Sequence, residues 1–260
     1  NAGALASFLW TVDGGSTGNS TAGAFENVTL RARDAQGNTI TNYTGTVSLS
    51  TTTAGVGDGV VQWDAVTPDA DGVLTNLTED DATYAFALSD AGVAILRVTN
   101  TRAETYQVRA QDGGVIQLSG NIVNASAAAN KTEVLSGNAQ SATVDTRVAS
   151  PPMVRVLDQF NNAVAGSAVT FTAVGGGGSV DATAGGPIDS TVVTASDGRI
   201  DCDVWRLGQI VGLNRLRAHI VSGSITSVDF TATGTAGAGA NLDLAPNSQS
   251  VTQGTALIVT

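Results

Sequence analysis

The sequence has few of the residues that carry most enzymatic chemistry and covalent cross-linking. Its 260 residues include one cysteine, one histidine and one methionine. A single cysteine excludes an internal disulfide, and one histidine cannot form the histidine and cysteine groups of zinc sites. His219 lies in an expected strand between Ala218 and Ile220, with no partner motif for nucleophilic catalysis. We therefore expect no catalytic residues and no enzyme activity in this chain.

Positively charged residues and long apolar runs are also scarce. The chain has 12 lysines and arginines against 23 aspartates and glutamates, a formal net charge of −11. Because a surface of this sign repels phosphate backbones, we expect no nucleic-acid partner. No stretch is long and apolar enough to predict a membrane span in this segment.

The abundant residues are those of β-strands and turns. Glycine occurs 31 times, and threonine, serine, valine and alanine are frequent. No segment has the apolar spacing of an amphipathic helix, whereas many short segments alternate with period two. The fold class predicted is all-β, with tandem β-sandwiches. The clearest expected strands are residues 8–12, 28–33, 47–50, 84–86, 93–98, 106–110, 153–158, 169–172, 200–205, 214–220 and 227–232.

Three alanine-rich and glycine-rich stretches, at residues 1–7, 124–130 and 235–241, divide the chain. Their spacing corresponds to one sandwich of about 100 residues per repeat. We predict a first sandwich at 1–123, a second at 124–234, and the linker and first strands of an incomplete third at 235–260. With no initiator methionine, the chain is expected to be an excerpt or a processed form of a longer protein.

The two complete repeats share one turn. Residues 34–38 read Asp-Ala-Gln-Gly-Asn and residues 158–162 read Asp-Gln-Phe-Asn-Asn, and the offset between them is 124 residues (158 − 34). Each follows an alternating segment, so both are expected to be hairpin-type turns. Residues 51–81 of the first repeat are polar and rich in turn residues, and we expect a long irregular loop there.

The second repeat resembles bacterial immunoglobulin-like domains of the invasin and intimin group. The matching segments are residues 156–166, 169–171, 195–199, 205–208 and 212–218. The first repeat is similar to a related bacterial surface repeat at residues 32–39, 43–47 and 86–93. The resemblance implies immunoglobulin-like sandwiches in the extracellular arrays of adhesins and other surface proteins. Similar modules occur in phage structural proteins, and the resemblance names no ligand.

Five acidic residues lie close together in the sequence near the end of the expected irregular loop. They are Asp69, Asp71, Glu79, Asp80 and Asp81. Calcium takes six to eight oxygen ligands, and an Asp-x-Asp-Gly run places two carboxylates beside a tight turn. These residues are the candidate metal site, with calcium as the candidate cofactor. The alternatives are a solvated acidic loop and, less favoured, a glycosidase carboxylate pair.

The tryptophans and the cysteine have a structural and a functional interpretation each. Trp10 lies in an entry strand and Trp205 beside an expected turn, which favours packing over a sugar-stacking role. Alternation places Cys202 on the face of its buried neighbours, as a small apolar side chain rather than a reactive thiol. Trp63 lies in the expected irregular loop, and if exposed it is the best candidate for a binding contact.

These observations predict a non-enzymatic structural or adhesive segment of an extracellular bacterial surface protein, stalk or filament. The expected partners are neighbouring immunoglobulin-like repeats or identical subunits, joined through edge strands or end to end. Three alternatives remain: a glycan- or receptor-binding module that uses residues 51–81, a phage or viral coat or fibre component at the virion surface, and an accessory spacer of a secreted hydrolase. The surrounding open reading frame would distinguish them.

Overall fold

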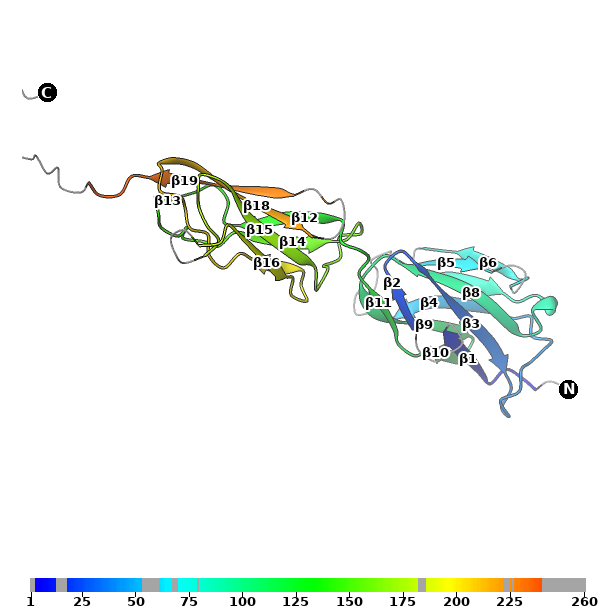
Figure 1. Ribbon diagram of the computed structural model, residues 1–260. Coiled ribbons are helices and arrows are strands. Elements are labelled where there is room, and N and C mark those ends of the chain that lie inside the picture. Colours follow the sequence, from blue (N-terminus) through cyan, green and yellow to red (C-terminus); the bar gives the residue numbers. More distant parts are fainter. Residues whose placement is uncertain are drawn as a thin grey trace, which may run out of the picture.

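The computed structural model describes residues 3–12, 18–52, 61–66, 70–78, 80–181, 186–221, 225 and 227–239. Figure 1 shows two β-sandwiches arranged end to end, joined by a short connection after β11. The predicted all-β fold of tandem sandwiches is therefore confirmed. Within the described ranges, no helix is long and apolar enough to cross a membrane. The strands expected for a third repeat fall in residues 240–260, outside the described residues.

The first sandwich packs a four-stranded sheet against a larger one. The smaller sheet has the order β1 (Ser7–Val12), β3 (Phe25–Arg33), β8 (Val93–Asn100) and β5 (Val61–Ala65). The larger sheet has the order β2 (Gly18–Thr21), β11 (Ile122–Ala125), β9 (Glu104–Asp112), β4 (Thr46–Thr52), β7 (Ala82–Ala85) and β6 (Val73–Asn76), with β10 (Val115–Leu118) also paired to β9. A short 3-10 helix, η1 (Leu88–Asp90), precedes β8. Strand β2 runs parallel to β11, which ties the beginning of the sandwich to its end.

The second sandwich repeats this plan with fewer strands. One sheet has the order β12 (Lys131–Ser136), β14 (Met153–Leu157) and β17 (Arg199–Asp201). The other has the order β13 (Gln140–Thr143), β19 (Val228–Thr235), β18 (Gly212–Ile220), β15 (Ala168–Gly175) and β16 (Asp189–Val193). Strand β13 is parallel to β19, as β2 is to β11. In both sandwiches the first strand lies in one sheet. The second strand lies in the other sheet, where it pairs with the last strand of the same sandwich.

Alternation along the strands builds each core. Every second residue of β3 is buried, and Val28 and Leu30 lie opposite Leu96 and Ala94 of β8. Burying a large apolar side chain contributes about 1.5–3 kcal/mol, so such a strand holds its face inward. The two cores share no residue, one being built from strands β1–β11 and the other from β12–β19 and their connections.

Three packing predictions are confirmed by these cores. Trp10 is buried in the first core, and Trp205 and Cys202 are buried in the second. Burial raises the pKa of the Cys202 thiol to about 12, with nearby Asp201 adding to the effect. Since a thiol needs its thiolate to react, Cys202 is unreactive at neutral pH.

Two stretches of the first sandwich contain strand residues beyond those expected from the sequence. Strand β11 spans Ile122–Ala125, and its Asn124 is buried and pairs with both β2 and β9. Residues 51–81 are not simply an irregular loop, since β5 and β6 lie within them. Strand β5 adds to the edge of one sheet beside β8, and β6 adds to the edge of the other beside β7. Residues 53–60, 67–69 and 79 lie outside the described residues.

Candidate functional site: the junction between the sandwiches

The junction is built on the turn that follows β14, at residues 158–162. Asp158 is fully buried, and its Oδ1 accepts the backbone N–H groups of Phe160 and Asn162, both at 2.8 Å. Its Oδ2 accepts the Asn162 side-chain amide and the backbone N–H of Ala127, both at 2.9 Å. Four donors therefore surround one carboxylate, which compensates for its burial without a cation.

The same contacts fix the connection between the sandwiches. Ala127 lies in that connection and donates to Asp158, and Asn130 donates its N–H to the carbonyl oxygen of Leu157 at 2.8 Å. An alanine- and serine-rich linker is otherwise a flexible chain. Here its backbone is attached at two points to the second sandwich, so it cannot swing freely relative to β14.

Asn162 joins the turn to the first sandwich. Its Nδ2 donates to the carbonyl oxygen of Thr101 at 2.8 Å, and its Oδ1 accepts the N–H of Ala103 at 2.9 Å. Thr101 and Ala103 lie in the turn between β8 and β9. A side-chain amide has an acceptor oxygen and two donor hydrogens, and here both kinds of group are used: Nδ2 also bonds Asp158. The planar amide of Asn162 thus forms hydrogen bonds with the backbone of the neighbouring sandwich at two points.

The turn that receives Asn162 is itself held by buried asparagines. The Oδ1 of Asn100 accepts the N–H of Arg102 at 2.8 Å. The Asn124 side chain donates to the carbonyl oxygens of Asn100 and Arg102, the first at 3.0 Å. Asn100 and Asn124 are both buried, so these polar groups form a fixed end to the first sandwich. The backbone atoms that meet Asn162 are therefore positioned before contact.

An apolar contact completes the junction. Gly23, between β2 and β3, has φ of 81°, and a Cβ added there would lie 2.4 Å from Cζ of Phe160. The φ and the close approach both require glycine. The Phe160 ring is half-buried against this position. Hydrogen bonds through Asn162 and ring packing through Phe160 thus act on two different turns of the first sandwich.

Trp63 is not the exposed contact residue considered from the sequence. It is 1% exposed, and its ring packs in the first core beside Trp10, with ring centroids 6.4 Å apart. Its Nε1 donates to the carbonyl oxygen of Asp80 at 3.0 Å, and the Asp80 N–H donates to the carbonyl oxygen of Val61 at 3.0 Å. The reason is alternation along β5, which turns Val61 and Trp63 inward and Gln62 outward.

The acidic residues proposed for calcium do not gather in the described part of the chain. Asp71 precedes β6, where its N–H donates to Asp90 at 2.6 Å, whereas Asp80 and Asp81 follow β6 at the opposite end. Among described residues, no group of three or more histidine, cysteine, aspartate or glutamate side chains could hold a metal. Asp69 and Glu79 lie outside the described residues, so the calcium hypothesis for the five residues stays a prediction.

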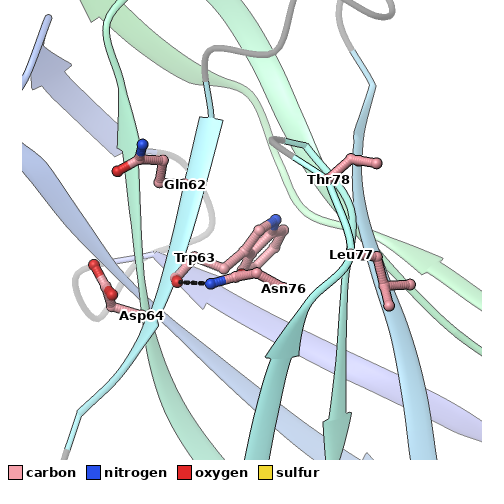
Figure 2. Close-up of a pocket in the computed structure, with 6 residues that line it drawn as sticks. All are labelled: Gln62, Trp63, Asp64, Asn76, Leu77 and Thr78. Atoms are coloured by element: carbon pink, nitrogen blue, oxygen red, sulfur yellow. Dashed lines mark hydrogen bonds between the residues drawn. The ribbon is translucent and has the colours of Figure 1, made fainter.

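A surface pocket of about 370 Å³ lies where β5 meets the end of β6. Its lining residues are Gln62, Trp63, Asp64, Asn76, Leu77 and Thr78. Figure 2 shows Asn76 between the two strands, with its Nδ2 donating to the carbonyl oxygen of Trp63 at 3.2 Å. Strands β5 and β6 are edge strands of different sheets. The bond from Asn76 to Trp63 and the bonds of Asp80 with Trp63 and Val61 therefore join the two sheets along this edge of the sandwich.

The sequence predicts the junction turn but not its role. The match between residues 34–38 and 158–162 is visible as a repeated Asp-x-x-x-Asn pattern. That pattern predicts a turn, and the structure confirms one of the Asx type. The contact of Asn162 with residues 101–103 joins positions about 60 apart in sequence, and no local pattern indicates it.

Solved structures of bacterial surface proteins are similar to this chain. The Yersinia pseudotuberculosis adhesin InvE aligns at 18% identity and a TM-score of 0.35, over 87% of this chain and 58% of InvE. The Escherichia coli adhesin FdeC aligns at 16% identity and 0.41, over 89% and 66%. Domains 5–6 of the S-layer protein SbsC align at 15% identity and 0.30, over 87% and 97%.

The chain spans about two thirds or less of the two adhesin structures. Adhesins of the invasin and intimin kind are thus among the matches, as the sequence resemblance implies. No family model and no curated protein matches the sequence. Because these three TM-scores are below 0.5, the fold rests on the strand order and the two cores of this chain.

Proposed function

We propose that this chain is a stiff spacer: a structural segment of an extracellular bacterial surface protein, stalk or filament that holds other parts at a fixed distance. The observation that carries the proposal is the Asn162 clamp, which bonds the second sandwich to the backbone of the first through both side-chain heteroatoms. Cell adhesion by such a protein would use a binding site carried at the end of the spacer. No chemistry by this chain is part of the proposal.

The energetics of the junction favour a single orientation. Two hydrogen bonds at about 0.5–1.5 kcal/mol each, with the half-buried Phe160 ring, favour the docked arrangement by about 2–4 kcal/mol. At 25 °C a free-energy difference of this size keeps more than about 95% of the molecules in the docked arrangement. Sandwiches joined by a free linker would instead move relative to one another by default. A stiff spacer of this kind would also suit a phage fibre or a secreted hydrolase. The sequence that surrounds this chain would distinguish these alternatives.

The spacer proposal is tested by the width of the distance distribution between two spin labels, one on each sandwich. Spin labels at Ser48→Cys in the first sandwich and Arg215→Cys in the second occupy exposed strand positions. Cys202 can stay, since its buried thiol is unreactive at neutral pH. We expect electron–electron double resonance to give one narrow distance distribution, and Asn162→Ala to broaden it at least about twofold.

Asn38→Ala is the matched control for this experiment. Asn38 holds the position of Asn162 in the first sandwich and bonds its own aspartate in the same way, but it lies at the outer end. We expect its replacement to leave the distribution unchanged. A broad distribution in the unaltered chain would reject the spacer proposal.

The pocket beside β5 supports a second candidate function, recognition of a glycan or receptor. Gln62, Asp64, Asn76 and Thr78 offer polar groups around the apolar side chain of Leu77, which is 62% exposed. Glycan sites combine polar side chains with such an apolar surface. Gln62 and Asp64 point outward from β5, so their replacement should not disturb the core.

The prediction for this candidate is a loss of binding without a loss of stability. A glycan array with the whole chain identifies a binder, and Gln62→Ala with Asp64→Ala should weaken that binding at least about tenfold, or about 1.4 kcal/mol. Ser48→Ala, on the exposed face of β4 and outside the pocket, is the control and should leave binding unchanged. An array with no binder, or binding that survives the double change, would count against this function.

A further inference from the structure

The turn at residues 34–38 of the first sandwich repeats the construction of the junction turn. The Oδ1 of Asp34 accepts the N–H groups of Gln36 at 3.0 Å and Asn38 at 2.8 Å. Its Oδ2 accepts the Asn38 side-chain amide at 3.2 Å. Asp158 bonds the residues two and four positions after it through the same atoms. The two turns therefore present an asparagine amide in the same way.

The chain that leads into each sandwich is attached alike. The N–H of Ala6 donates to the carbonyl oxygen of Arg33 at 3.0 Å, as Asn130 donates to Leu157. Hydrogen bonds from Asn38 and from the backbone of Gln36 lower the pKa of Asp34. Gly3 lies against this side chain, since a Cβ added to Gly3 would be 3.0 Å from the Cβ of Asp34. Gly3 thus takes the place of Ala127, since both precede their aspartates by 31 residues (34 − 3 and 158 − 127). Turn and leading segment form the same assembly at both sites.

The two turns differ in what covers them. Asn162 is half-buried because it bonds the 101–103 turn, whereas Asn38 is exposed. Among the described residues, nothing donates to the Oδ1 of Asn38. The first sandwich thus carries, at its outer end, the groups that clamp a neighbour at the junction, and here those groups face solvent.

We propose that residues 34–38 are a docking site for a further sandwich, which presents a β8–β9 turn like that at 101–103 and is joined ahead of Gly3. This inference rests on the proposed spacer function and names the partner of its outer end. The occupant cannot be residues 101–103 of a second copy of this chain, because there the turn is already bonded to that copy's Asn162. Gln36 replaces Phe160, so the hydrogen bonds of Asn38 carry the contact.

An extended chain tests the proposal directly. Residues 1–126 are placed ahead of residues 3–260, so that the added sandwich meets Gly3 through the linker that otherwise meets Ala127. Spin labels at Ser48→Cys in the added and the original first sandwich report on the new junction. Labels at Ser48→Cys of the original first sandwich and Arg215→Cys report on the existing one. We expect the new distribution to be narrow, and Asn38→Ala in the original sandwich to broaden it at least about twofold.

The two junctions make the outcomes separable. Asn38→Ala should leave the existing junction narrow, and Asn162→Ala should broaden the existing junction alone. A new junction that is broad, or that stays narrow with Asn38→Ala, overturns the docking site while the existing junction still supports the spacer. If the existing junction is itself broad, the spacer proposal fails, and the docking site fails with it.

Discussion

Replacing Trp63 with alanine will lower the free energy of unfolding of the first sandwich by about 3–5 kcal/mol. The ring is 1% exposed and packs beside Trp10 in the first core. Its removal leaves a cavity and also deprives the Asp80 carbonyl oxygen of the hydrogen bond from Trp63 Nε1. Urea unfolding measures the loss of stability, and hydrogen exchange of each sandwich shows whether the loss falls on the first sandwich.

Two variants separate packing from the hydrogen bond and from surface effects. Trp63→Phe keeps an aromatic ring but not the Nε1–H, so it should cost less, about 1–3 kcal/mol. Gln62→Ala, next to it on the outward face of β5, should change stability by less than about 0.5 kcal/mol. If Trp63→Ala unfolds like the parent chain and loses glycan binding instead, the buried position assigned to this residue is wrong.

The strands are predictable where alternation gives a local signal. Residues 28–33 and 214–220, expected as half-buried strands, lie in β3 and β18. Strands β5 and β6 were not predicted, since each has only four or five residues within a stretch rich in turn formers. Their pairing at opposite sheet edges depends on β8 and β7, which the local pattern does not identify as partners.

Closeness in sequence misleads where a hairpin intervenes. Asp71 and Asp81 are ten positions apart (81 − 71), but β6 and its turn place them at opposite ends of a four-residue strand. At about 3.3 Å per residue, that strand alone separates them by more than a cation site spans. Conversely, Asn162 and Thr101 are distant in sequence and in direct contact. Neither the separation of Asp71 from Asp81 nor the contact of Asn162 with Thr101 can be predicted from hydrophobic periodicity or residue spacing in the sequence.

Removing the Asp158 carboxylate has the second large expected effect. Asp158→Ala should lower the free energy of unfolding of the second sandwich by about 2–4 kcal/mol, because four donors around a fully buried carboxylate lose their acceptor at once. It should also loosen the junction, since the same carboxylate holds Ala127 of the linker and the amide of Asn162. Amide exchange of Ala127, Phe160 and Asn162, with the spin-label distances, measures both effects.

Asp34→Ala separates these two consequences. Asp34 organises an equivalent turn, so its removal should destabilise the first sandwich while the existing junction stays narrow. Asp158→Asn keeps the shape and one acceptor oxygen but turns an NH₂ group toward N–H donors, and it should fall between the parent and the alanine variant. An Asp158→Ala chain whose junction is as narrow as the parent's would show that Asn162 is held without the carboxylate, and the turn would then be a local support rather than the base of the clamp.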